Sequence, residues 1–232
     1  MGRITLAAQL DGAEPGARRR LEEYITAVGA GVRTQCRVTR TTMPWLRATQ
    51  RDVENRGQVT RSKSKGAYLP GRIPPRRPRL FRFLSDPGYD GHSTVVLFSY
   101  GRQVNAVDPA ATVVAQRDSV LKSCLGTYWT DPEDDECHIR RLRELYRELY
   151  AETGGVPVSD AHTDGSYINY PDVDLADARW NTSGVPWHAP YFKGIYARLQ
   201  RVKAIWDLQD VFRHALSVRA VRLNLRPTGA AP

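Results

Sequence analysis

The chain has 232 residues, of which 41% are hydrophobic and 25% are charged, as in soluble globular proteins of one or two domains. It has no apolar run near the roughly 20 residues of a membrane-spanning helix and no signal-peptide pattern at residue 1, so we expect a cytoplasmic protein without membrane contact. The net charge is +9, but 29 of the 34 basic residues are arginine, and many lie among glutamates in helix-like segments. Because known nucleic-acid-binding motifs are also lacking, we expect no nucleic-acid partner.

The cysteines and histidines predict no metal site. Three cysteines form no CxxC pair, so reduced thiols are expected. Four scattered histidines have neither i, i+4 spacing nor clustered carboxylates; they are His138, His162, His188 and His214.

The first half of the chain shows strand and helix patterns in turn. Alternating residues predict strands at Ile4–Leu10 and Cys36–Thr42, and a 3.6-residue apolar period predicts a helix at Arg18–Val28. Residues 51–79 are rich in Arg, Gly and Pro, which favours a long loop. A β-branched and aromatic run predicts a strand at Thr94–Tyr100.

The second half is mainly helical in pattern. A helix should begin after Asp131-Pro132 and end before Gly154-Gly155. Another is expected at Tyr191–Trp206, with Tyr196, Leu199 and Val202 facing inward, and a short one at Val211–Leu216. Strands and helices without regular alternation predict an α+β fold, an antiparallel sheet with helices on one face.

The segment Gly165–Asp174 is the richest in functional groups. In an extended segment Tyr167 and Asn169 share one face, and Ile168 and Tyr170 share the other. A phenol beside an amide could hold a polar ring or accept a substrate proton. The same pattern also suits a strand ending in an Asx turn, and local pattern alone favours that reading.

Several sequence blocks in register resemble one enzyme family. They are Arg61–Leu69, Ser99–Asn105, Ala111–Asp118, the Tyr-Ile-Asn-Tyr-Pro-Asp run from Tyr167, and the segment from Tyr191 to Phe212. Together they resemble the substrate-binding and C-terminal region of the berberine bridge enzyme-like FAD-linked oxidases over about residues 1–218. The resemblance implies a substrate-binding part at 1–160, a berberine-bridge-type segment at 161–218 and a tail at 219–232.

The resemblance also implies a chemistry. Family members oxidise an alcohol or amine carbon of a small molecule by hydride transfer to FAD and then reduce dioxygen. It implies that Tyr167 is a base for the substrate hydroxyl, with Tyr100 at a second polar position. It places Asn169 and Tyr170 against the flavin and Cys124 in the substrate pocket. An unperturbed phenol titrates near pH 10, so a tyrosine base needs a neighbouring group that favours its deprotonation.

Family chains carry a flavin-binding domain that this sequence does not match. Gly91-His92-Ser93 is similar to the family's flavin-attachment motif but falls in the wrong region, so we expect a turn there. The chain by itself is therefore not expected to bind FAD tightly. We expect its C-terminal helices to pack on a separate FAD-binding domain, and an exposed apolar patch near Tyr128, Trp129, Trp180 and Trp187 to cause self-association. The alternative is a catalytically silent small-molecule-binding or interaction module.

Overall fold

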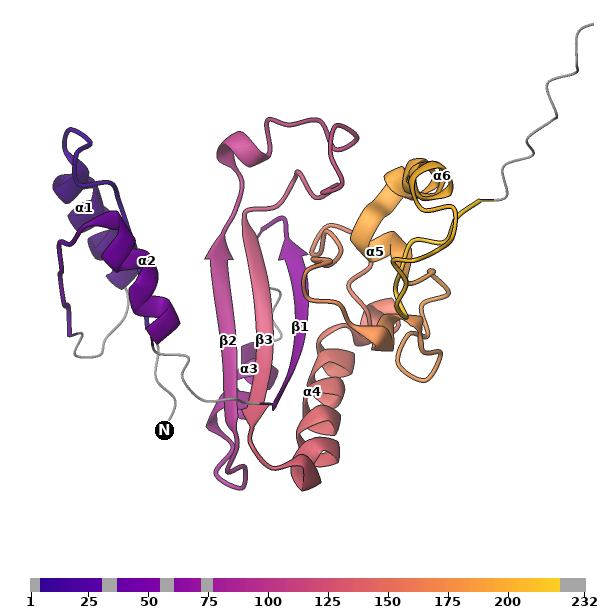
Figure 1. Ribbon diagram of the computed structural model, residues 1–232. Coiled ribbons are helices and arrows are strands. Elements are labelled where there is room, and N and C mark those ends of the chain that lie inside the picture. The colour runs from indigo at the N-terminus through magenta and orange to yellow at the C-terminus, as the bar shows by residue number, and fades with distance from the viewer. Residues whose placement is uncertain (1–4, 31–36, 55–60, 72–76, 222–232) are drawn as a thin grey trace, which may run out of the picture. The chain divides into compact units, whose positions relative to one another are not determined.

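A computed structural model describes residues 5–30, 37–54, 61–71 and 77–221. The chain divides into two compact units, Met1–Val59 and Thr60–Pro232, which are coloured along the chain in Figure 1. The boundary predicted at residue 160 falls inside the second of these units. It would separate two parts of that unit, and it stays a prediction.

The described part of the first unit is helical. It contains α1 (Ala17–Gly29) and α2 (Trp45–Glu54), and α1 confirms the helix expected from the apolar period. The two predicted strands are wrong, since residues 5–10 and 37–42 have no strand structure; Ile4 and Cys36 lie outside the described residues. An alternating pattern makes a strand only where a neighbouring strand accepts its backbone hydrogen bonds, and residues 5–10 and 37–42 pair with none.

The second unit contains a three-stranded antiparallel sheet. Its strands are β1 (Arg61–Leu69), β2 (His92–Ser99) and β3 (Leu121–Trp129), in the order β1-β3-β2. Gly66 of β1 and Val96 of β2 both lie opposite Cys124 of β3. The sheet confirms the predicted strand at 94–100 and corrects two expectations. Residues 51–79 are not one long loop, because they include β1, and His92 and Ser93 begin β2 instead of forming a turn.

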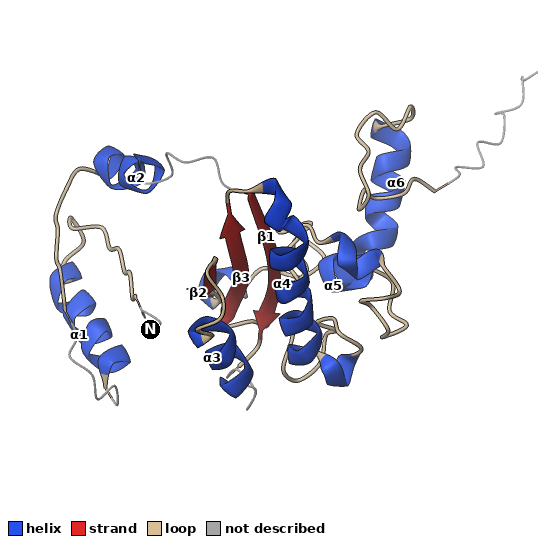
Figure 2. Ribbon diagram, turned by 90° about the horizontal axis from the view of Figure 1, so that it is seen from below, coloured by secondary structure: helices blue, strands red, loops and turns tan. Residues whose placement is uncertain are grey.

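Two helices, α3 (Arg77–Ser85) and α4 (Asp135–Leu149), cover one face of this sheet (Figure 2). The helix predicted after Asp131-Pro132 is confirmed as α4, whose Leu142 and Leu145 are buried. They pack with Phe83 of α3 and with Ala67 and Leu125 of the sheet. Burial of each such side chain contributes about 1.5–3 kcal/mol, so this layer is the core that fixes the sheet.

A second core lies in the C-terminal part. Here α5 (His188–Phe192) and α6 (Tyr196–Trp206) replace the single predicted helix from Tyr191. The break is at Lys193, whose φ of 47° is incompatible with a continuing helix. Tyr196 is buried as expected, but Val202 is 45% exposed. The short helix predicted at 211–216 does not form. Five 3-10 helices complete the described elements, at Arg102–Val104, Pro132–Asp134, Ala151–Thr153, Val173–Ala176 and Lys193–Ile195.

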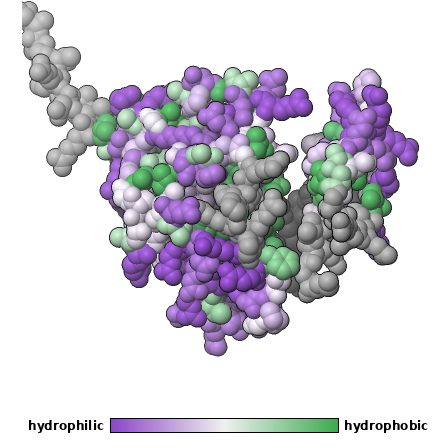
Figure 3. Space-filling model, turned by 180° about the vertical axis from the view of Figure 1, so that it is seen from behind, coloured by the Kyte–Doolittle hydropathy of each residue, from purple (hydrophilic) through white to green (hydrophobic). Residues whose placement is uncertain are grey.

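Exposed apolar side chains gather at a different place from the predicted one. Trp129 and Trp187 are buried, because the Trp129 ring stacks on that of His138 and Trp187 belongs to the C-terminal core. The exposed group instead follows the end of α6, and we call it the α6 patch: Ile205, Trp206, Leu208, Val211 and Phe212. In the view of Figure 3, the coloured surface is mainly hydrophilic, with hydrophobic residues in small groups.

Candidate active site

The sheet presents different side chains on its two faces. Because successive side chains of a strand alternate, Ala67 and Leu125 enter the core under α4, whereas their neighbours point to the opposite face. We call this opposite face the tyrosine face. Its strand residues are Ser64, Gly66 and Tyr68 of β1, Thr94, Val96 and Phe98 of β2, and Lys122, Cys124, Gly126 and Tyr128 of β3.

Tyr167 and Asn169 meet on the tyrosine face. The Asn169 side-chain amide donates a hydrogen bond to the Tyr167 phenol oxygen over 2.9 Å. The Lys122 ammonium lies 4.2 Å from the centre of the Tyr167 ring. A cation and an amide donor both stabilise negative charge on a phenol, so this arrangement can support proton transfer to Tyr167.

The backbone that carries these residues is a turn and not the expected extended segment. The Tyr170 N–H donates to the Tyr167 carbonyl over 2.9 Å, which folds residues 167–170 back on themselves. The predicted proximity of Tyr167 and Asn169 therefore holds for a different geometrical reason. The prediction that Tyr170 points to the face opposite Tyr167 is wrong. The Tyr170 ring packs edge-on to the Tyr167 ring, with the centroids 5.3 Å apart.

Two further tyrosines lie beside Tyr167. Tyr68 is 1% exposed, and its ring centre is 5.0 Å from that of Tyr100 and 5.9 Å from that of Tyr167. Burial, and then the neighbouring Tyr100 phenol, raise the pKa of Tyr68. Burial also raises the pKa of Tyr100, whose hydroxyl donates to the Gln116 carbonyl over 3.0 Å. Both phenols thus favour the protonated form, which suits a hydrogen-bond donor better than a base.

Cys124 lies under Tyr170 on the same face. The thiol is largely buried, and burial raises its pKa, an effect that the neighbouring Ser64 and Tyr170 side chains partly offset. Burial likewise raises the pKa of Tyr170 and lowers the pKa of the Lys122 ammonium. The pocket role of Cys124 and the flavin contacts of Asn169 and Tyr170 stay predictions.

The tyrosine face fits the ring of a flavin in chemistry. Gly66 and Gly126 leave space that neighbouring tyrosine rings occupy: a Cβ at Gly66 would lie 3.1 Å from Tyr170, and one at Gly126 would lie 3.0 Å from Tyr128. Aromatic surface and polar donors, here Asn169 and Lys122, are what a planar heteroaromatic ring with polar edges requires. These residues could hold the flavin ring.

Sequence reasoning missed Lys122 and Tyr68. Lys122 is two residues from Cys124, so an assignment of β3 would have placed both on one face. That strand was not predicted, because Leu121–Trp129 lacks a clear alternation of apolar and polar residues. Tyr68 belongs to a block that the family resemblance covered, but no side-chain role was assigned to it.

The described parts of the chain contain neither a metal-binding cluster nor a membrane-spanning helix. There, no group of three or more His, Cys, Asp or Glu side chains could hold a metal ion. No helix among the described residues is long and apolar enough to cross a membrane.

Comparison with known proteins relates this chain to flavoenzymes. The family model described as "Berberine and berberine like" matches residues 166–219. Aclacinomycin-N/aclacinomycin-A oxidase from Streptomyces galilaeus is 51% identical over 226 residues, which cover 94% of this chain and 40% of that protein. A crystal structure of aclacinomycin oxidoreductase superposes with a TM-score of 0.85 at 49% identity, over 91% of this chain and 43% of that one. A crystal structure of a glycopeptide hexose oxidase complexed with teicoplanin superposes with a TM-score of 0.81 at 44% identity. The superposition covers 90% of this chain and 42% of that one.

This chain thus spans about 40% of the length of these relatives. The matched region is their C-terminal portion and includes the berberine-bridge-type segment. The chain belongs to the berberine bridge enzyme-like family of FAD-linked oxidases and corresponds to the C-terminal part of its members.

Proposed function

We propose that this chain forms the substrate side of an FAD-dependent oxidase that oxidises a hydroxyl-bearing carbon of a small molecule. The observation that carries the proposal is the placement of Tyr167 between the Asn169 amide and the Lys122 ammonium. A carbinol gives up its hydride more readily as its hydroxyl proton leaves, so a group that accepts this proton in the transition state accelerates the reaction.

Tyr167 is the proposed base. As the phenolate, Tyr167 takes the substrate hydroxyl proton and becomes a neutral phenol. The amide of Asn169 donates to the same oxygen, and the Lys122 cation faces the ring. Tyr100 and Tyr68 are held protonated by burial, so they do not compete for the substrate proton. Tyr100, which is partly exposed, orients a polar group of the substrate. A bound flavin supplies the hydride acceptor, and the tyrosine face holds its ring.

The α6 patch is the proposed contact with the FAD-binding part of the enzyme. Trp206 is 83% exposed and Phe212 is 79% exposed; large apolar groups that cluster at such exposure mark an interaction surface. Relatives are more than twice as long as this chain, so they carry a further part that could cover the patch. In this proposal, the further part of the enzyme makes most of the contacts with FAD.

A glycosyl hydroxyl on a small natural product is the proposed substrate class. One relative is named as an aclacinomycin oxidase, and another as a glycopeptide hexose oxidase. The substrate must place a hydroxyl against the phenol of Tyr167, and hydroxyls on a rigid ring meet such a geometric demand well.

A chimera tests the proposal. This chain would replace the aligned C-terminal segment of aclacinomycin oxidase, to which it is 51% identical. We expect a yellow protein with bound flavin that oxidises aclacinomycin N and releases hydrogen peroxide. A folded, flavin-loaded chimera without oxidation of aclacinomycin N or of a panel of glycosides would contradict the proposed function.

A further inference from the structure

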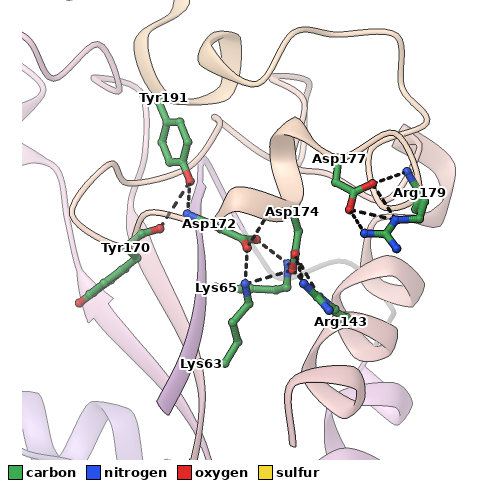
Figure 4. Close-up of polar contacts among 9 residues, drawn as sticks. All are labelled: Lys63, Lys65, Arg143, Tyr170, Asp172, Asp174, Asp177, Arg179 and Tyr191. Carbon is green, nitrogen blue, oxygen red and sulfur yellow. Dashed lines mark hydrogen bonds and ion pairs between the residues drawn. The ribbon is translucent and has the colours of Figure 1, made fainter. Parts of the chain in front are cut away.

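A buried ion cluster lies on the helix-covered side of β1 (Figure 4). It joins three cations, Lys63, Lys65 and Arg143, to two carboxylates, Asp172 and Asp174. Lys65 bridges both carboxylates, with its Nζ 2.7 Å from an Asp174 oxygen. Lys63 also reaches both, at 2.7 Å and 3.1 Å.

The centre of the cluster is buried, while the side chains of Lys63 and Arg143 at its edge are 14% and 28% exposed. The Lys65, Asp172 and Asp174 residues are each 2% exposed. Charges so deeply buried are tolerated only when each is paired, so any displacement of the segment that carries the carboxylates is costly.

This segment crosses from one face of the sheet to the other. Asp172 lies on the helix-covered side, whereas Tyr170, two residues earlier, lies on the tyrosine face above Gly66. A Cβ at Gly66 would meet the Tyr170 ring at 3.1 Å and the Ser123 carbonyl at 3.2 Å. An alanine at position 66 would therefore require the Tyr170 ring or the strand to shift by a few tenths of an ångström.

Tyr191 fixes the crossing point. Its hydroxyl accepts a hydrogen bond from the Asp172 backbone N–H over 2.9 Å and donates to the Tyr170 carbonyl over 3.5 Å. Ser166, just before the turn, donates to the Gly66 carbonyl over 2.8 Å. Both ends of the Tyr167–Tyr170 turn are therefore tied to β1 or to α5.

We propose that Lys63, Lys65, Asp172 and Gly66 are positioning residues, which set the place of Tyr167 and Tyr170 on the tyrosine face from the opposite side of β1. The ion pairs of Asp172 and Asp174 hold the segment after the turn on the helix-covered side of β1. The missing side chain at Gly66 leaves space for the Tyr170 ring on the tyrosine face. The significance for catalysis rests on the proposed function; the positioning itself does not.

Cys124 provides a probe of position that needs neither flavin nor turnover. Its thiol is buried and interacts with Tyr170, so it reacts with a thiol reagent only when Tyr170 moves away. With Cys36 and Cys137 replaced by serine, Cys124 is the one thiol of the full chain. Its rate of modification by DTNB is measured at fixed pH, and circular dichroism shows that each variant is folded.

We expect Asp172→Asn and Lys63→Met to raise the modification rate about tenfold or more, through local opening of the turn. Lys63→Arg should restore protection, because Lys63 is partly exposed and has room for a guanidinium that keeps the charge. Gly66→Ala should raise the rate while leaving every charge of the cluster in place.

Two matched variants separate positioning from general loosening. Asp86→Asn removes an ion pair with Arg141 on α4, and Gly194→Ala adds a Cβ where nothing lies within 4 Å. Both should leave Cys124 protected. The proposal would be overturned if the Cys124 thiol stayed protected from DTNB in folded Lys63→Met and Gly66→Ala. It would also be overturned if Asp86→Asn and Gly194→Ala lost this protection to the same extent as Lys63→Met and Gly66→Ala. If Asp172→Asn does not fold, the Lys63 and Gly66 variants decide.

Carried into the chimera, Gly66→Ala should lower kcat with flavin content unchanged. If the parent chimera is inactive, the proposed function fails while the thiol result still judges the positioning.

Discussion

The Lys122 ammonium lies 4.2 Å from the centre of the Tyr167 ring, on the face of the sheet that α3 and α4 leave uncovered. It also lies 4.9 Å from the Phe98 ring and 5.6 Å from the Tyr170 ring. The cation therefore lies among aromatic rings, and charge developing on the Tyr167 oxygen is within its field. Of the two tyrosines that it contacts, Tyr167 is the nearer.

Lys122→Met should slow oxidation by the chimera. A partly desolvated cation over an aromatic ring contributes up to about 2 kcal/mol, so we expect kcat to fall roughly ten- to thirtyfold. Lys122→Arg keeps the charge and should retain most of the rate. Equal rates for the methionine and wild-type proteins would show that the cation has no part in the reaction.

Asp174→Asn should destabilise the chain strongly. Removing one partner from a buried ion cluster costs about 3–5 kcal/mol, because the cations are left uncompensated. Urea unfolding followed by circular dichroism measures the loss. The matched control is Asp177→Asn, whose partner Arg179 is 81% exposed; its midpoint should hardly move. Similar shifts in the two variants would mean that the cluster is no more stabilising than a surface pair.

Acid should unfold the chain through the same carboxylate. Burial alone would raise the pKa of Asp174, but the hydrogen bond from Arg143 and the ammonium of Lys65 lower it well below its ordinary value. The unfolded chain then takes up a proton near pH 4 while the folded chain does not, so stability falls as pH drops below about 4. We expect Asp174→Asn to flatten this dependence in urea midpoints measured from pH 6 to pH 3. An unchanged slope would assign the acid sensitivity to other groups.

The sequence predicted the elements whose stability is local. The helices at 17–29 and 135–149 have apolar residues at helical spacing. Their end signals lie in the sequence in or close beside them, as Asp131-Pro132 and Gly154-Gly155 do for the second. It failed for β1, where Lys63 and Lys65 make the strand look like a polar loop. Lys65 is buried and Lys63 is largely buried because Asp172 and Asp174, more than a hundred residues away, neutralise them. Long-range pairing of this kind leaves no periodic signal.

The sequence predicted which residues form the candidate site better than it predicted their arrangement. Family resemblance pointed to Tyr167 and Asn169, which do meet. Their turn geometry and the approach of Lys122 depend on the packing of residues 167–170 over β3, which local pattern does not encode.

The α6 patch should make the chain self-associate when its proposed partner is absent. Trp206→Ser combined with Phe212→Ser removes two rings that are 83% and 79% exposed, so a larger share of monomer is expected in sedimentation velocity at high concentration. Trp45→Ser, at a residue 73% exposed in the first unit, is the matched control and should have little effect. A monomeric wild-type chain at high concentration would contradict the role of the patch.

Turnover by Tyr167→Phe in the chimera tests the central claim most directly. The substitution removes one hydroxyl and keeps the ring, so folding and flavin content should match the parent, and Tyr100→Phe serves as the comparison. Loss of a general base costs about 10²–10⁴-fold in rate, and we expect kcat to fall in that range for Tyr167→Phe and much less for Tyr100→Phe. Equal turnover by the parent and Tyr167→Phe would remove Tyr167 from the mechanism, and a large loss in Tyr100→Phe alone would move the base to Tyr100.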